Sequence, residues 1–263
     1  MLEDTLASGD SPRPSDTYVQ SFARGLDVLR SFGAQAPAQT LSEAAERVGM
    51  TRAGARRILL TLQTLGFVEM EGRQFRLTPK VLELGYAYLS SQPWWNLSQP
   101  VLEDLTLQLK ESTSGAVLDG SDIVYVLRVP THKIMSINLG VGTRLPAWCT
   151  SMGRVLLAAL PEDEREQRVA GMEMVAHTPK TITDPDELLM QLAKVRRQGY
   201  AVINEELELG LLSMAVPLRD RTGRVVAAIN VSAQAHQTSV EHMKEAYLPK
   251  LQEAAQRISA LMP

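Results

Sequence analysis

The stretch TRAGARRILLTLQTLG, residues 51–66, predicts an amphipathic helix with two unlike faces. At about 100° per residue its apolar side chains fall on one stripe, as in a helix packed on a core; they are Ala55, Ile58, Leu59, Leu62 and Leu65. Arg57 points almost directly away from this stripe, and Arg52 and Arg56 lie on its flank. Exposed arginines often serve solubility alone, but three on one face also form a surface for a polyanion.

The residues just before this helix favour the polyanion. TLSEAAERVG reads as a shorter helix, in which Thr40 and Glu43 have the spacing of a capping box and Gly49 stands where a left-handed residue ends a helix. Met50 alone separates Gly49 from Thr51, the expected cap of the arginine helix. Two short helices joined by so tight a turn, with the basic face on the second, are typical of a helix-turn-helix, whose second helix enters the major groove.

Two short runs after the arginine helix, FVEME and RQFRLT, flank the turn Glu71-Gly72 and predict a β-hairpin. Such a hairpin is a wing, whose Arg73, Gln74 and Arg76 could reach phosphates or the neighbouring minor groove. Residues at the start of the first helix would fix the register on the DNA backbone. The predicted DNA-binding residues are therefore Ser21, Arg24, Thr51, Arg52, Arg56, Arg57, Arg73 and Arg76.

The charge of the chain is unevenly distributed. The 263 residues, of which 44% are hydrophobic, carry a formal net charge of -3. Residues 18–80 hold nine Lys or Arg against five Asp or Glu, a net +4, whereas residues 1–17 carry -3 and residues 81–263 carry -4. Basic charge is concentrated where the helix-turn-helix is expected, as phosphate binding requires.

Several classes of protein are disfavoured by the residues present. Cys149 is the single cysteine, which excludes an internal disulfide and an all-cysteine metal site. Ser151 does not lie in a GxSxG motif, the four histidines lack metal-binding spacing, and GVGTRL is a weak echo of a dinucleotide loop. We therefore expect no enzyme, no cofactor and no metal.

The N-terminus gives an expectation about location. MLEDTLASGDSPRPSD places acids where a signal peptide has a basic start and an apolar core, and no run approaches the ~20 apolar residues of a membrane span. We expect a cytoplasmic chain without membrane contact. Residues 1–17, rich in Ser, Asp and Pro, are predicted to be a disordered tail.

The rest of the chain divides into three predicted parts. Residues 18–78 form the winged helix-turn-helix, residues 79–95 a linker helix that begins at Thr78-Pro79, and residues 96–263 a second domain. One face of the linker helix carries Leu82, Gly85, Tyr86 and Leu89. That stripe could pack on the same helix of a second subunit or, equally well, on the second domain.

The second domain is predicted to be α+β. WNLSQPVLEDLTLQLKEST reads as its first helix, Asp122–Val129 and Lys133–Leu139 as strands, and SMGRVLLAALP and DPDELLMQLAKVRRQG as helices, the latter ending at Gly199. SMAVPLR and RVVAAINVS flank the turn DRTG and predict a hairpin in the middle of the sheet. A last helix is expected from about Val240 to Leu261.

The chain from Tyr18 onward resembles the IclR-type transcriptional regulators. The resemblance lies in SFARGLDVLRSF, LSEAAERVGMTRAGARRILLTLQTLGFV, VGTRLPAWCTSMGRVLLAALP, RRQGYAVINEELELGLLSMAVPLRD and GRVVAAINVSA. It implies a homodimer or homotetramer with a winged helix, a linker helix and a GAF-like domain that binds a small carboxylic acid. LTPKVLELGYAYLSS and DIVYVLRVPTHKIMSINLGVGTRLPAW are similar to the branch that controls aromatic-acid catabolism, whose effectors are protocatechuate, 4-hydroxybenzoate or β-ketoadipate.

The helix beginning at Thr150-Ser151 is a candidate anion site, because the N–H groups of Ser151, Met152 and Gly153 are free to point at a ligand. Alternatively, Thr150 or Ser151 caps its own helix. The resemblance implies that the effector's carboxylate is held by this helix start and by polar side chains of the last two strands. These positions are Ser151, Met152, Ser213, Asn230 and Ser232, with Glu206 nearby; the large Met152 and the replacement of a frequent cysteine by Ser213 disfavour small 2-oxo acids.

Further residues are candidates for the same pocket. Alternation along INVS places Asn230 and Ser232 on one face of a strand. Either Arg128, which we prefer, or Arg144 could pair with a carboxylate, although each could instead make a structural ion pair. Apolar or stacking candidates, each of which could equally be core, are Trp148, Met135, Tyr125 and Ile137.

The sequence thus predicts a DNA-binding regulator that responds to a small aromatic or dicarboxylic acid. The alternative is a protein-interaction or sensing module whose winged helix binds a protein partner. Salt dependence separates the two, because binding through many phosphates weakens steeply as salt rises.

Overall fold

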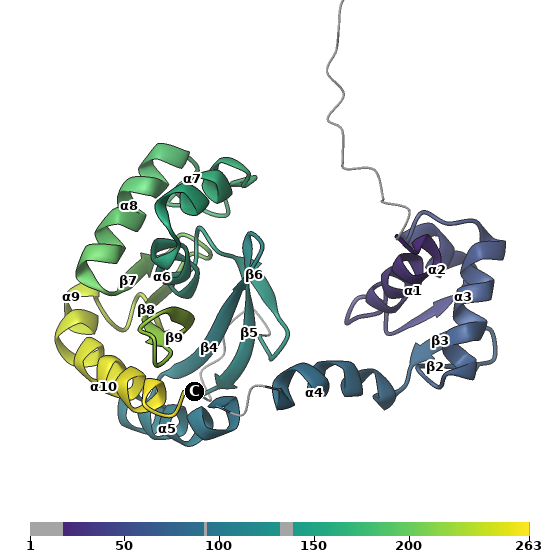
Figure 1. The fold of residues 1–263 in the computed structure, drawn as a ribbon, viewed down its shortest axis with the longest axis horizontal. Helices are drawn as coiled ribbons and strands as arrows, with labels where there is room; N and C mark the ends of the chain where they lie inside the picture. The colour runs from purple at the N-terminus through teal and green to yellow at the C-terminus, as the bar shows by residue number, and fades with distance from the viewer. Residues whose placement is uncertain (1–17, 92–93, 132–138, 263) are drawn as a thin grey trace, which may run out of the picture. The chain divides into compact units, whose positions relative to one another are not determined.

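The computed structural model describes residues 18–91, 94–131 and 139–262 (Figure 1). Its contacts divide the chain into two compact units, Met1–Ala87 and Tyr88–Pro263. Each unit has a hydrophobic core of its own. The two units are therefore described separately.

The N-terminal unit is a winged helix-turn-helix, as predicted. Its elements in chain order are α1 (Gln20–Arg30), β1 (Ala38–Thr40), α2 (Leu41–Arg47), α3 (Arg52–Thr64), β2 (Val68–Glu71) and β3 (Gln74–Leu77). The strands form an antiparallel sheet in the order β1-β3-β2. A small core joins the helices to the sheet and consists of Val28, Phe32, Ala44, Leu59, Leu62, Val68 and Phe75.

Local signals set the turn between α2 and α3. Thr40 and Glu43 form the predicted capping box, and Gly49 has a φ of 60°, a left-handed conformation that favours glycine. Thr51 accepts a hydrogen bond from the Gly54 N–H at 3.1 Å, which caps α3. Leu65, predicted on the buried stripe, is 52% exposed because α3 ends one residue before it.

A short 3-10 turn (Pro79–Val81) and α4 (Leu82–Ser90) follow the wing. Thr78 caps the turn through its hydroxyl, and Pro79 takes the first helical position, as expected. None of the residues of α4 is buried, although the helix carries Leu82, Leu84 and Tyr86.

The C-terminal unit is built on a six-stranded antiparallel sheet with the order β6-β5-β4-β9-β8-β7. Its strands are β4 (Ser112–Asp119), β5 (Asp122–Val129), β6 (Arg144–Pro146), β7 (Ala201–Asn204), β8 (Leu211–Arg219) and β9 (Val225–Gln234). Its helices are α5 (Trp94–Leu109), α6 (Ser151–Ala159), α7 (Glu162–Ala170), α8 (Pro185–Gln198), α9 (Val240–His242), a π-turn (Met243–Tyr247) and α10 (Leu248–Ser259).

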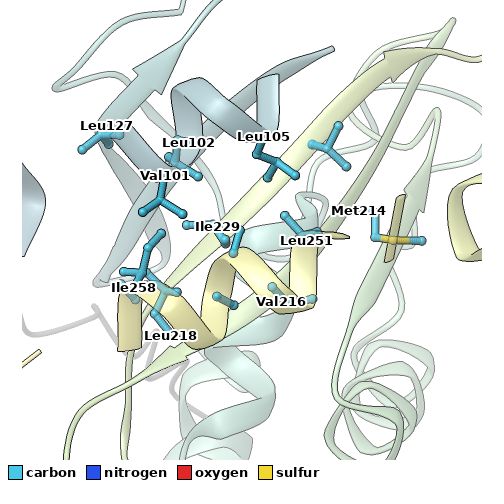
Figure 2. Close-up of a cluster of buried hydrophobic side chains, with 14 of the residues drawn as sticks. Val101, Leu102, Leu105, Leu127, Met214, Val216, Leu218, Ile229, Leu251 and Ile258 are labelled. Atoms are coloured by element: carbon cyan, nitrogen blue, oxygen red, sulfur yellow. The ribbon is translucent and has the colours of Figure 1, made fainter. Parts of the chain in front are cut away.

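Helices cover both faces of this sheet. Apolar side chains of α5 and α10, among them Leu102 and Leu251, pack over one face with side chains of β8 and β9 such as Ile229 (Figure 2). On the other face, α6 and α8 pack through a second cluster that includes Leu157 and Leu192. This α+β arrangement is the predicted fold class.

One prediction about the second domain needs correction and another falls outside the described residues. The helix expected through WNLSQPVLEDLTLQLKEST ends at Leu109, because Lys110 adopts a left-handed φ of 55° and β4 begins at Ser112. The strand expected at Lys133–Leu139, with Met135 and Ile137, lies outside the described residues except for Leu139. In this domain β4, β6, β7 and α7 were not predicted, and neither was β1 in the N-terminal unit.

Within the described ranges, the helices include none that is long and apolar enough to cross a membrane.

The capping box of α2 makes a testable contribution to stability. Thr40→Ala removes the side chain that accepts from the Glu43 N–H, and we expect it to lower the free energy of unfolding by ~1 kcal/mol. Thr61→Ala is the matched control, since its hydroxyl bonds to the Arg57 carbonyl inside α3 and caps nothing. Urea unfolding of the full chain measures both, and a Thr40→Ala midpoint equal to the wild type would contradict the capping role.

Candidate functional site

The exposed face of α3 is the first candidate site. Arg52, Arg56 and Arg57 are exposed, whereas Ala55 and Leu59 on the opposite side are fully buried. Among the described residues these three arginines have no ion-pair partner. The helix therefore presents three uncompensated guanidinium groups to solvent, a surface suited to phosphates and guanine edges.

The other predicted DNA-binding residues differ in whether they already make contacts within the N-terminal unit. Ser21 and Arg73 are exposed. Arg24 donates to the Val48 carbonyl at 3.3 Å and thereby ties α1 to the turn before α3. Arg76 lies 3.5 Å from a carboxylate oxygen of Glu71 in the wing, and the Thr51 oxygen accepts the capping bond of α3.

The second candidate site is a cavity in the C-terminal unit, between the start of α6 and strands β5, β8 and β9. In the single chain its volume is about 20 Å³, room for about one water molecule. The wall consists of Tyr125, Leu139, Leu145, Cys149, Thr150, Ser151, Met152, Ile203, Leu207, Leu211, Ser213, Asn230 and Ser232. The family resemblance implied five positions for carboxylate binding: Ser151, Met152, Ser213, Asn230 and Ser232. All five lie in this wall, and all but Met152 are polar.

The start of α6 has no side-chain cap. The Thr150 hydroxyl donates to the Pro146 carbonyl at 2.9 Å instead, and the Ser151 hydroxyl accepts from Ser213 at 3.0 Å. The alternative in which either residue caps its own helix is therefore wrong. The N–H groups of residues 151–153 have no hydrogen-bond partner in the described part of the chain, and they carry the positive end of the helix dipole.

Strand pairing brings the remaining polar groups to the same side. Ser213 pairs with Ser232 across β8 and β9, so their side chains share a face of the sheet. Asn230 lies two residues earlier on β9 and donates to Ser232 at 3.1 Å. Its other amide atom, Oδ1, is buried without a partner among the described residues, and so it is available to a ligand that donates a hydrogen bond.

No side chain in the described wall carries a formal charge. Burial raises the pKa of Tyr125 to about 12, and burial with the nearby Glu206 carboxylate raises the pKa of the Cys149 thiol to about 12. Both groups are therefore neutral at physiological pH. The negative charge of a bound carboxylate would be compensated by the free N–H groups of α6 and by hydroxyl donors.

Three predicted effector residues lie outside the wall. The Trp148 ring stacks on His177 with a centroid separation of 6.1 Å and an interplanar angle of 28°. Glu206 makes a buried ion pair with Arg154, with 2.5 Å between Oε2 and the guanidinium. Arg128 is half-buried and donates to the Ser114 hydroxyl at 3.3 Å, one strand removed from Asn230.

Arg144, the other candidate for a carboxylate, makes a surface ion pair with Asp119 at 2.6 Å and Asp122 at 3.1 Å. It therefore holds the edge of the sheet. Sequence reasoning missed Cys149, Thr150 and the apolar wall that Ile203, Leu207 and Leu211 provide. Cys149 and Thr150 could have been found from their place directly before α6, whereas the residues of the apolar wall come from segments distant in sequence.

Two family models match the chain. Residues 86–260 match the C-terminal domain of the bacterial transcriptional regulator IclR, and residues 21–72 match the IclR helix-turn-helix domain. The chain belongs to the IclR family. It is thus a DNA-binding transcriptional regulator of that family, and the relatives are likewise named as regulators.

Relatives within the IclR family include proteins named for aromatic catabolism. The Pca regulon regulatory protein of Pseudomonas putida is 41% identical over 89% of this chain and 81% of its own length. The p-hydroxybenzoate hydroxylase transcriptional activator of Acinetobacter baylyi is 33% identical over 94% of this chain and 93% of its own.

A solved structure also resembles the whole chain. The IclR homologue of Microbacterium hydrocarbonoxydans, crystallised in complex with 4-hydroxybenzoate, has a TM-score of 0.79 and 29% identity. The match covers 91% of this chain and 98% of that one.

Gly153 tests the geometry of the α6 start. A Cβ added at this position would lie 2.2 Å from the Ala147 carbonyl oxygen, so Gly153→Ala must push the turn before α6 away from the helix. We expect a loss of ~1–3 kcal/mol in unfolding free energy. Gly171→Ala is the control, because its Cβ would meet no atom closer than 3.6 Å. Equal unfolding midpoints for the two variants would show that the close contact does not constrain the fold.

Proposed function

We propose that the chain controls genes of aromatic-acid catabolism by binding double-stranded DNA and a small aromatic or dicarboxylic acid of the protocatechuate, 4-hydroxybenzoate or β-ketoadipate class. The observation that carries the effector proposal is the uncapped start of α6, which faces a cavity lined by Ser213, Asn230 and Ser232. The names of the relatives support the class of acid.

Each end of such an acid has a matching part of the cavity. The carboxylate would accept from the N–H groups of Ser151, Met152 and Gly153 and from nearby hydroxyls. The carbon skeleton would lie against Tyr125, Leu145 and the apolar residues of β7 and β8. In this assignment Trp148, Arg128 and Glu206 support the site from outside its wall.

The parts of the chain divide this work. In the proposed division, residues 18–78 bind DNA, residues 79–95 link, and residues 96–263 bind the effector. The α3 arginines enter the major groove, with Ser21, Arg24, Thr51, Arg73 and Arg76 as further DNA contacts. A regulator of this kind acts on the chromosome, so we place it in the cytoplasm.

The oligomer is proposed to be a dimer or tetramer joined in part through α4. Leu82 and Tyr86, one helical turn apart, are 73% and 71% exposed in the single chain. Pairing two copies through this face would bury them and present two arginine helices to two half-sites.

Fluorescence anisotropy on labelled DNA from upstream of the protein's own and adjacent genes tests the function. We expect sequence-specific binding that weakens steeply with salt and is altered by protocatechuate, 4-hydroxybenzoate or β-ketoadipate. Binding no stronger than to random DNA, at low salt and with every acid, would favour the protein-partner alternative for the arginine face.

Arg56→Ala tests the groove assignment. If Arg56 reads a guanine, we expect affinity for the specific site to fall by ~1–3 kcal/mol, selectively at that base; if it holds a phosphate, all sequences should weaken alike. Arg30→Ala in α1 removes the same charge from an exposed position in the same unit and serves as the control. Unchanged affinity of Arg56→Ala at physiological salt would exclude Arg56 from the interface.

The double variant Leu82→Ser/Tyr86→Ser tests the α4 interface. Since neither side chain is buried in the single chain, we expect the fold to persist. The oligomer should be weaker, so that it dissociates at protein concentrations at which the wild type stays assembled. Leu107→Ser, at a position on α5 that is 76% exposed, is the control. Sedimentation velocity measures the assembly, and an unchanged distribution of masses would remove α4 from the interface.

A further inference from the structure

The ion pair between Arg154 and Glu206 is buried in the C-terminal unit but does not line the cavity. The side chains are 4% and 10% exposed, and Arg154 donates to Oε2 of Glu206 at 2.5 Å. Burial raises the pKa of the Glu206 carboxyl, an effect that Arg154 opposes. Because the desolvation of two charges offsets much of their attraction, an apolar pair of similar size would often stabilise a fold as well. We therefore expect the pair to have a role other than stabilising the fold.

Each partner lies close in sequence to residues that line the cavity. Arg154 follows Ser151 by one turn on α6, whose start carries the free N–H groups. Glu206 lies in the segment between β7 and β8, next to Leu207, which lines the cavity. The ion pair thus fastens the Leu207 segment to the helix that offers the anion site.

Arg154 also holds the turn before α6. Its Nε donates to the Trp148 carbonyl at 2.8 Å. Trp148 immediately precedes Cys149 and Thr150, both of which line the cavity. One planar guanidinium therefore fixes the turn with one donor and the Leu207 segment with another, which an ammonium group cannot reproduce.

Glu206 is in turn held from the far side. Its carboxylate accepts from the Ile182 N–H at 3.4 Å, and its main-chain carbonyl accepts from the Thr181 hydroxyl at 2.5 Å. The preceding Glu205 has a left-handed φ of 60°, pairs with Lys180 and accepts from the Gly210 N–H at 2.7 Å. The segment is anchored at both ends, and the ion pair sets its distance from α6.

We propose that Arg154 and Glu206 are positioning residues of the effector cavity: their ion pair sets the separation between the Leu207 segment and the start of α6 on which binding of the acid depends. The inference rests on the proposed function, in which this cavity is the effector site. Glu206 acts through Arg154 and Leu207 and does not touch the acid.

Two conservative variants of the full-length chain test the positioning. Glu206→Gln keeps the size of the side chain and removes its charge, whereas Arg154→Lys keeps the charge but cannot serve Trp148 and Glu206 together. We expect each to bind 4-hydroxybenzoate at least tenfold more weakly by titration calorimetry. DNA binding without the acid should stay within twofold of the wild type.

Cys149 provides a readout that needs no effector. It is the single cysteine of the chain, and it lies buried in the cavity wall. Loosening the Leu207 segment should raise its rate of reaction with N-ethylmaleimide at least fivefold in Arg154→Lys, which keeps both charges of the pair. Glu206→Gln also removes a carboxylate that raises the pKa of the thiol, so its labelling rate does not isolate the loosening. If the wild type binds none of the proposed acids, the proposed effector class fails, while the labelling rates still decide whether the pair positions the wall.

A stability-matched control and an apolar replacement separate positioning from folding. Leu251→Ala creates a cavity in the core on the opposite face of the sheet and lowers the melting temperature. It is the control for any destabilisation by Glu206→Gln or Arg154→Lys, and it should change neither acid binding nor labelling. The double variant Arg154→Met/Glu206→Leu should regain melting temperature but not 4-hydroxybenzoate affinity. The proposal is overturned if the double variant regains both, or if Arg154→Lys labels at the wild-type rate.

Discussion

The close approach of α6 to the turn in front of it is the constraint on which the cavity depends. Because Gly153 has no Cβ, the Ala147 carbonyl can lie against the first turn of the helix. That turn directs the Thr150 hydroxyl back to Pro146 and away from the helix start. The N–H groups of residues 151–153 are consequently left for a ligand, in a wall whose described side chains carry no charge. These donors favour a ligand that brings hydrogen-bond acceptors, and the positive end of the helix dipole favours an anion among them.

The register of β8 and β9 places further polar side chains on the cavity side of the sheet. Ser213 faces Ser232 across the β8-β9 pair, and Asn230 lies on the same side of β9. A slip of one residue would turn all three toward the core beneath α5 and α10. The hairpin therefore determines both the hydrophobic cluster of Figure 2 on one face and the polar wall on the other.

Local signals explain why the winged helix could be predicted and parts of the second domain could not. Thr40 and Glu43 are three residues apart, and Gly49 ends α2 through its left-handed conformation. A short stretch of sequence is therefore enough to predict where α2 begins and ends. By contrast, β4 reads STSGAVLD, whose small residues show no alternation because the first five are buried. Burial on both faces removes the pattern by which a strand is recognised.

The cavity was predictable only in its polar half. Ser151, Ser213, Asn230 and Ser232 followed from helix-start physics, strand alternation and the family resemblance. Glu206, which the resemblance implied near the carboxylate site, lies outside the wall, and its partner Arg154 is 52 residues away, with no periodicity that connects them. Ion pairs of this range are set by tertiary packing, which a single sequence does not encode in any local pattern.

Communication between effector and DNA must pass through an element whose arrangement is not already fixed by its own packing. An acid bound by α6 shifts the DNA-binding state only if its affinity differs between two arrangements of the protein. The helix α4 meets that condition over most of its length, since none of its nine residues is fully buried, although Leu89 packs against the core of the C-terminal unit, and a helix so short is marginal in water. Its stability comes from whatever packs on its exposed leucines and tyrosines. In the proposed oligomer, the packing of α4 would be the variable through which a small change at the cavity wall alters the spacing of two winged helices.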